Sequence, residues 1–130
     1  MVIDTSALVA ILKAELDAEA LLMRINRADT RLISSATRLE IGIVVFGQLA
    51  EAGLHELELL LAHAEIQTIP FTVSHLHWAL HGWRQFGKGR HQAALNLGDC
   101  FSYGLARGLD LPLLFKGKDF VLTDVESALV

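Results

Sequence analysis

The sequence predicts an α/β fold in which helices cover both faces of a parallel sheet. Short apolar segments bounded by turn residues alternate with longer segments that repeat apolar residues at helical spacing. A hydrophobic fraction of 52% and a mean hydropathy of +0.41 are high for 130 residues. Either a sheet buried on both faces or an apolar surface kept for a partner accounts for them. No linker or repeat divides the chain, so we expect one domain over residues 1–130.

Each element follows from a local pattern. The expected elements, in chain order, are a strand at 2–4, a helix to 12, a helix to about 28, a strand at 31–34, a helix from about 35 to a break at Gly53, a helix at 54–64, a strand at 65–69, a helix to 87, a loop at 87–98, a helix at 99–107 and a strand at 113–115. Thr5 or Ser6, Asp17 and Ser74 have side chains that cap helix N-termini. The tail from Asp119 is expected to form one short turn and a weak fifth strand.

Four carboxylates occupy positions where the local sequence makes a charge unfavourable. They are Asp4 after the apolar start, Glu40 within an apolar run, Asp99 after Asn96-Leu97-Gly98, and Asp119 after the last strand. The carboxyl ends of parallel strands meet at one crevice, and Glu40 and Asp99 lie near the starts of helices that flank it. Because gathered carboxylates repel one another, a divalent cation is the usual reason for such an arrangement. The sequence therefore predicts a metal site.

Each acid taken alone has an ordinary structural explanation. Asp4, Asp99 and Asp119 are residue types that cap helices or turns, and Glu40 can pair with a nearby arginine. The combination of all four at converging positions favours the site over these separate explanations.

The charge is unevenly distributed along the chain. Although the net charge is −4, residues 84–118 carry six basic and two acidic side chains, so this segment is +4 and the remainder is −8. Such a segment can face a polyanion or can simply be a solvated surface. The candidates for phosphate contact are Lys88, Arg90 and His91 in the loop, Lys116 and Lys118 before the last acid, and Arg107, which can instead compensate a helix carboxyl end.

Four segments spread over the whole chain carry a recognisable combination of residues. They are 2–8 (VIDTSAL), 35–40 (SATRLE), 95–103 (LNLGDCFSY) and 113–120 (LLFKGKDF), the last followed by Thr123 and Asp124. In this order they resemble the PIN-domain nucleases, and more narrowly the VapC-type toxin ribonucleases, over essentially the full length. The resemblance implies a three-layer α/β/α sandwich whose parallel sheet has four or five strands in the order 3-2-1-4-5.

The resemblance also implies a function and a set of site residues. It assigns Asp4, Glu40, Asp99 and Asp119 to the metal site, with Thr5 or Ser6 as hydrogen-bonding support. Asp124 either orients a metal-bound water or caps a turn. The implied reaction is hydrolysis of RNA phosphodiester bonds with Mg²⁺ or Mn²⁺, by one ion or two. The implied partners are an RNA substrate, a VapB-type antitoxin and a second copy of the chain.

The compartment is predicted from two further features. The only cysteine, Cys100, cannot form an internal disulfide, which fits a reducing cytoplasm. No apolar stretch is long enough to span a bilayer, so no membrane association is expected.

Two other functions compete with this interpretation. A non-catalytic PIN-like module would bind RNA or protein without cleaving it, although the four intact acids argue against this. An aspartate-dependent phosphatase of the haloacid type needs a second acid two residues after the first, and Ser6 stands at that position.

Overall fold

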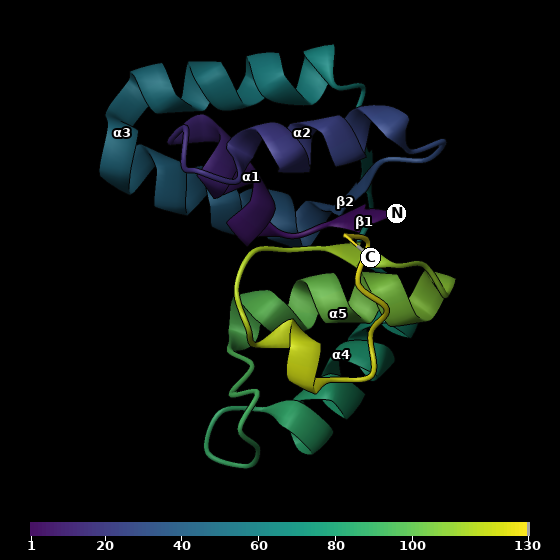
Figure 1. Ribbon diagram of the computed structural model, residues 1–130. Helices are drawn as coiled ribbons and strands as arrows, with labels where there is room; N and C mark the ends of the chain where they lie inside the picture. Colours follow the sequence, from purple (N-terminus) through teal and green to yellow (C-terminus); the bar gives the residue numbers. More distant parts are fainter. Residues whose placement is uncertain (130) are drawn as a thin grey trace.

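A computed structural model describes residues 1–129 and contains a parallel four-stranded sheet of order β3-β2-β1-β4 (Figure 1). The elements are β1 (Val2–Ile3), α1 (Thr5–Leu12), α2 (Ala18–Arg27), β2 (Leu32–Ser34), α3 (Ser35–His63), β3 (Gln67–Ile69), α4 (Val73–Phe86), α5 (Leu97–Leu109), β4 (Leu113–Leu114) and the 3₁₀ turn η1 (Phe120–Leu122). This confirms the predicted α/β class and the order of the first four strands. The weak fifth strand is reduced to a single parallel bridge between Leu113 and Ser127, beside β4.

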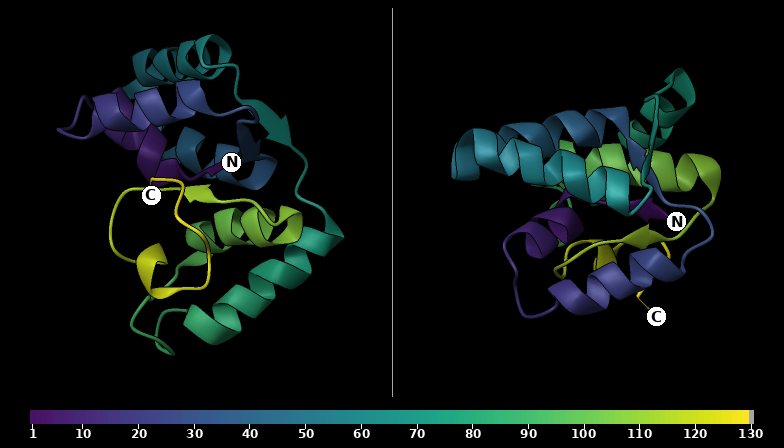
Figure 2. Two further views of the ribbon diagram at one scale, coloured as in Figure 1. Left: turned by 45° about the vertical axis from the view of Figure 1, so that its right-hand side comes forward. Right: turned by 90° about the horizontal axis from the view of Figure 1, so that it is seen from above.

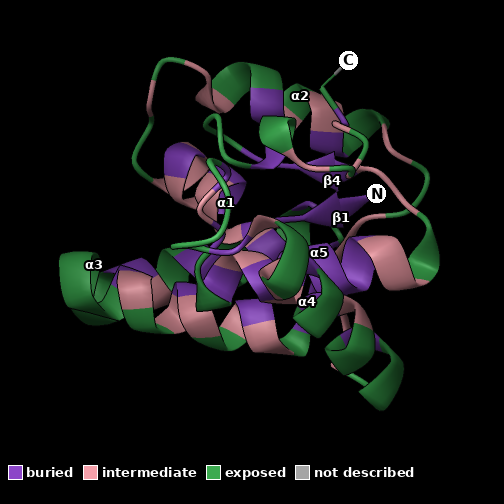
Figure 3. Cartoon of the chain, turned by 90° about the horizontal axis from the view of Figure 1, so that it is seen from below, coloured by how far each residue is buried: buried purple, intermediate pink, exposed green. Residues whose placement is uncertain are grey.

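Side chains of successive strand residues enter two different cores, as the alternation of a pleated sheet requires. Ile3 and Leu114 join a core built with α1, α2 and α3, whereas Val2 and Leu113 join a core built with α4 and α5. All four are completely buried. Figure 3 shows these buried strands between helices whose outer surfaces are exposed, and both views of Figure 2 show the same layering. A sheet covered on both faces thus accounts for much of the high hydropathy.

The long helix α3 is two helices that fold back on each other, seen at the upper left of Figure 1. The break lies at Ala50, with φ 54° and ψ −150°, and not at Gly53 as the sequence suggested. Gly53 serves close packing instead, because a Cβ there would lie 2.4 Å from the Leu49 Cβ and 2.8 Å from a Val45 methyl carbon. Gly53, just past the break, lets the two halves of α3 pack closely against each other.

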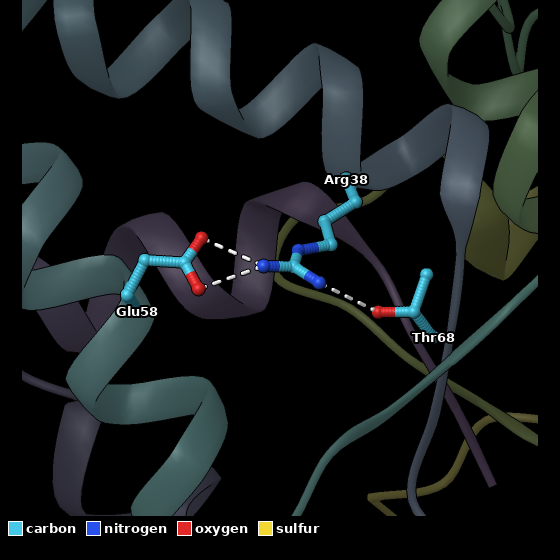
Figure 4. Close-up of polar contacts among 3 residues, drawn as sticks. All are labelled: Arg38, Glu58 and Thr68. Atoms are coloured by element: carbon cyan, nitrogen blue, oxygen red, sulfur yellow. Dashed lines mark hydrogen bonds and ion pairs between the residues drawn. The ribbon is translucent and has the colours of Figure 1, made fainter.

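One arginine fastens this helical hairpin to the sheet. One terminal nitrogen of Arg38, in the first half of α3, donates to both carboxylate oxygens of Glu58 in the second half, at 2.7 and 2.8 Å. Its other terminal nitrogen donates to the Thr68 hydroxyl on β3 at 3.0 Å, so one guanidinium joins three segments (Figure 4).

The helix caps differ in part from those expected. Asp4, whose separate structural explanation was a helix cap, caps α1 in place of Thr5 or Ser6. Thr72, not Ser74, caps α4. An N-cap residue needs extended backbone angles, and a residue leaving a strand has them already, as Asp4 does with ψ 156°. Asp17 occupies the N-cap of α2 without a cap hydrogen bond, and its carboxylate pairs with Lys116 at 3.3 Å.

No helix within residues 1–129 combines the length and the apolar composition needed to cross a bilayer.

The strained backbone angles of Ala50 should affect the stability of the protein. These angles lie in a region that is comfortable only for glycine, and such strain costs about 1–3 kcal/mol. Replacing Ala50 by glycine removes the strain but adds unfolded-chain entropy of roughly 0.5–1 kcal/mol. We therefore expect Ala50→Gly to raise the free energy of unfolding by about 1 kcal/mol, measured by urea denaturation. Ala62→Gly, in regular helix, is the control and should lower it; an Ala50→Gly protein less stable than wild type would contradict the assigned turn.

Candidate active site

The four acids singled out in the sequence come together at the carboxyl edge of the sheet. Asp4 directly follows β1, and Glu40 lies in the second turn of α3, which begins immediately after β2. Asp99 lies in the first turn of α5, and Asp119 lies between β4 and η1. The charges of Asp4, Glu40 and Asp119 all act on the Asp99 carboxyl group, so the four form one electrostatic cluster.

Asp4 is the most firmly held of the four. Its side chain is buried, with 3% of the residue exposed, and it accepts three hydrogen bonds. Oδ1 accepts from the Ser102 hydroxyl at 2.5 Å, and Oδ2 accepts from the Ser6 hydroxyl at 2.7 Å and the Ser6 amide at 3.0 Å. Ser6 thus donates twice to this carboxylate, and the end of β1 carries a carboxylate held by hydrogen bonds.

Glu40 accepts a hydrogen bond from Thr5 and packs against a glycine. The Thr5 hydroxyl donates to Oε1 at 2.5 Å. A Cβ at Gly98 would lie 1.4 Å from Oε2, so only glycine leaves room for this carboxylate. Burial raises the pKa of Glu40, the Thr5 hydrogen bond opposes that shift, and the charge of Asp4 adds to it.

Asp99 forms a capping box with Asn96. The Asn96 amide donates to the Asp99 carboxylate at 3.0 Å, and the Asp99 amide donates to the Asn96 side-chain oxygen at 2.9 Å. Burial raises the pKa of Asp99 to about 7; the hydrogen bond from Asn96 opposes this shift, and the charges of the other acids add to it. A carboxyl group with such a pKa is partly buried and has negatively charged neighbours.

The donor set fits a hard divalent cation. Carboxylate and hydroxyl oxygens are the ligands that Mg²⁺ and Mn²⁺ prefer. Burial, and to a smaller extent the charge of neighbouring acids, raises the pKa values of Glu40 and Asp99, and a bound cation would offset both effects. As the side chains stand, no three Asp, Glu, His or Cys groups in residues 1–129 surround a common point closely enough to hold an ion. The carboxylates would therefore have to draw closer to share one.

Asp124 belongs to a different cluster. Its Oδ1 accepts a hydrogen bond from the hydroxyl of the buried Tyr103 at 2.9 Å, and its Oδ2 lies 3.8 Å from Arg107. The Arg107 guanidinium in turn lies 4.8 Å above the centre of the Trp78 ring. In this structure Asp124 thus joins the carboxyl-terminal segment to α5 through Tyr103 and Arg107.

The basic candidates fall into two groups. Lys88, Arg90 and Lys118 are exposed, and the loop carrying the first two lies on the same side as η1 and the start of α5 (Figures 1 and 2). Lys116 instead pairs with Glu15 at 3.0 Å, and its amide donates to the Ser6 hydroxyl. His91 is exposed, and its ring contacts Phe86 edge-on.

Sequence reasoning missed two residues of the site. Gly98 and Ser102 flank Asp99 on α5, and they respectively make room for Glu40 and hold Asp4. The spacing of Ser102, three residues after Asp99, was the available signal, because residues three apart share one face of a helix. This spacing points to a role for Ser102 only when Asp4 is seen to contact the face of α5 that carries Asp99 and Ser102.

Comparison with known proteins agrees with this fold and cluster. Residues 1–126 match the family model described as PIN domain. The chain is 48% identical over 127 residues to Ribonuclease VapC of Mycolicibacterium smegmatis, covering 98% of each protein. It is 46% identical over 127 residues to Ribonuclease VapC30 of Mycobacterium tuberculosis (98% of this chain, 97% of the relative) and 42% identical over 130 residues to Ribonuclease VapC28 of the same organism (99% and 98%). The chain therefore belongs to the PIN-domain family and, within it, to the VapC ribonucleases.

The raised pKa of Asp99 predicts how stability depends on pH without metal. Because the pKa in the folded protein, about 7, exceeds the ordinary value near 3.8, the folded state binds this proton more tightly. The resulting stabilisation is complete below about pH 4 and is lost as the pH rises through about 7. Asp99→Asn removes this dependence and, after allowing for partial solvent screening, should raise the free energy of unfolding at pH 8 by roughly 2 kcal/mol.

Urea denaturation in EDTA at pH 5 and pH 8 checks this prediction. Asp110→Asn, at the exposed end of α5, is the matched control and should follow the wild type. A wild-type protein as stable at pH 8 as at pH 5, with no gain from Asp99→Asn, would contradict the raised pKa of Asp99.

Proposed function

We propose that this VapC ribonuclease is a Mg²⁺- or Mn²⁺-dependent endoribonuclease and the toxin of a VapBC-type pair. The observation that carries the metal dependence is the electrostatic cluster of Asp4, Glu40, Asp99 and Asp119, in which burial and mutual repulsion raise the pKa of Asp99 to about 7. Relatives named as ribonucleases at 46–48% identity support the same reaction class.

Asp4, Glu40, Asp99 and Asp119 are the proposed ligands of the cation. When bound, the ion would neutralise charge on the scissile phosphate and activate water for in-line attack. Three hydrogen bonds fix the orientation of the Asp4 carboxylate, so the same oxygen atom would face the cation in every copy of the protein. Asp119 is exposed and makes no cap hydrogen bond, which leaves its carboxylate free to orient water or to turn toward the cation.

Exposed basic residues are proposed to hold the RNA backbone. Lys88 and Arg90 project from the loop before α5, and Lys118 precedes Asp119. Such side chains contact phosphate oxygens and fix the position of the strand without reading its sequence. Lys116 is proposed to contribute when RNA competes for it with Glu15 and Asp17, and His91 to contribute from the same loop.

A VapB-type antitoxin and a second copy of the chain are the proposed protein partners, in the cytoplasm. Support comes from large apolar side chains that stay exposed on the first half of α3: Leu39 is 67% exposed, Ile43 65% and Phe46 51%. With Gly42 and Leu54 they line an open apolar groove. Apolar surface of this kind marks a protein–protein contact.

Loss of metal-dependent cleavage in Asp99→Asn tests the proposed function. Without this carboxylate the site loses one proposed ligand, so cleavage of a mixed RNA substrate in Mn²⁺ should fall at least 100-fold while the protein remains folded. Fragments resolved on a denaturing gel provide the measurement, with Asp110→Asn as the control that keeps activity. RNA bound equally by wild type and variant, but cleaved by neither with any divalent metal, would support the non-catalytic alternative.

Replacing Lys88 and Arg90 together by alanine should weaken RNA binding while leaving metal affinity unchanged. Each phosphate contact contributes about 0.7 to the slope of log binding constant against log salt concentration for single-stranded RNA. Losing two contacts should therefore make this slope less steep by roughly 1.4. Filter binding with catalytically inactive Asp99→Asn protein in a salt series provides the measurement. Lys13→Ala is the control for a lysine outside this surface; equal salt slopes in all three proteins would place the RNA elsewhere.

A further inference from the structure

A hydroxyl residue accompanies the acid on each of the two helices that contribute to the site. Thr37 precedes Glu40 by three residues on α3, and Ser102 follows Asp99 by three residues on α5. Both hydroxyl residues are completely buried, and their oxygens lie 3.3 Å apart. Residues three apart share a helix face, so each hydroxyl lies on the side of its helix that carries the acid.

The direction of each hydrogen bond around Asp4 follows from the chemistry of its ends. A carboxylate only accepts, so the single hydroxyl proton of Ser102 is donated to Asp4 Oδ1. Ser102 must then be the acceptor in its contact with Thr37. On the other side the Lys116 amide can only donate, so the order there is Lys116 amide to Ser6 hydroxyl to Asp4 Oδ2.

These two chains leave the oxygens of Asp4 unequally occupied. Oδ2 accepts two hydrogen bonds from Ser6, whereas Oδ1 accepts one, from Ser102. With two lone pairs on each oxygen, Oδ1 retains one for another partner. Since Ser102 is 0% exposed, water has no ready access to replace the serine hydroxyl.

We propose that Ser102 is a positioning residue that turns Asp4 Oδ1 toward the cation. This rests on the proposed function, because it presumes that Asp4 is a ligand. Thr37 supports Ser102 from behind, but more weakly, because 3.3 Å exceeds the usual 2.5–3.0 Å range for a bond between hydroxyl groups. The hydroxyl of Ser102 thus links α5 to the end of β1 at the atom that binds the ion.

Metal affinity separates this role from a purely structural one. A buried serine that only satisfied Asp4 would affect stability, whereas a positioning residue also affects how tightly the folded protein binds the ion. Partners that orient metal ligands typically change metal affinity by about 10- to 100-fold when removed. Calorimetric titration with Mn²⁺ in the absence of RNA measures that affinity without depending on cleavage.

Ser102→Ala should weaken Mn²⁺ binding about 10- to 100-fold, and Thr37→Val by less. The matched control is Ser34→Ala: this serine is also completely buried, but its hydroxyl accepts from the Ala36 amide at the start of α3. Ser34→Ala should lose stability and keep the wild-type affinity. Equal affinity in wild type and Ser102→Ala overturns the positioning role while leaving the metal site intact.

Mn²⁺ binding by the wild type and by Asp99→Asn, and proton NMR of the Ser102 hydroxyl, are two further measurements that can contradict the proposal. If the wild type binds no Mn²⁺, or if Asp99→Asn binds it as tightly as the wild type, the proposed metal site itself fails and the role of Ser102 fails with it. If Ser102→Ala does not fold, proton NMR of the metal-free wild type decides. A slowly exchanging Ser102 hydroxyl proton coupled to the Asp4 carboxyl carbon supports the donor assignment, and a rapidly exchanging one overturns it.

Discussion

Repulsion among carboxylates at one edge of the sheet is the constraint on which the rest of this structure depends. Asp4, Glu40, Asp99 and Asp119 come from four separate segments, and burial combined with their mutual charge raises the pKa of Asp99 to about 7. The fold meets this constraint with neutral hydrogen-bond donors. The Ser6 hydroxyl donates to Asp4, the Thr5 hydroxyl donates to Glu40 and the Asn96 backbone amide donates to Asp99. A cation would supply the positive charge that these neutral groups lack.

The architecture of the sheet could be predicted from sequence because it depends on local pattern. Apolar strands such as Leu113–Leu114 are buried on both faces, and the helices between them repeat apolar residues at regular spacing. Helix caps were harder to predict from the sequence, because whether Asp4 or Ser6 caps α1 depends on where the strand ends. The break in α3 was misplaced because Ala50 adopts backbone angles that its residue type does not indicate.

The candidate site likewise has residues that could be predicted from the sequence and residues that could not. Acids in unfavourable local positions could be identified along the sequence, but the groups that hold them could not, because those contacts join residues far apart in the chain. Ser102 and Asp4 are separated by 98 positions. Lys116 and Asp124 show the opposite case: both look suitable for the site in the sequence, and in this structure each has a different partner, Glu15 for the lysine and Tyr103 for the aspartate.

The contact between Gly98 and Glu40 makes the chain sensitive at a position that carries no chemistry of its own. Any side chain at residue 98 would occupy the space of the Glu40 carboxylate, 1.4 Å from Oε2. Positions at which a substitution disturbs the site are therefore more numerous than its acids. A single-nucleotide change in codon 98 is enough to displace the Glu40 carboxylate while every acidic codon stays intact.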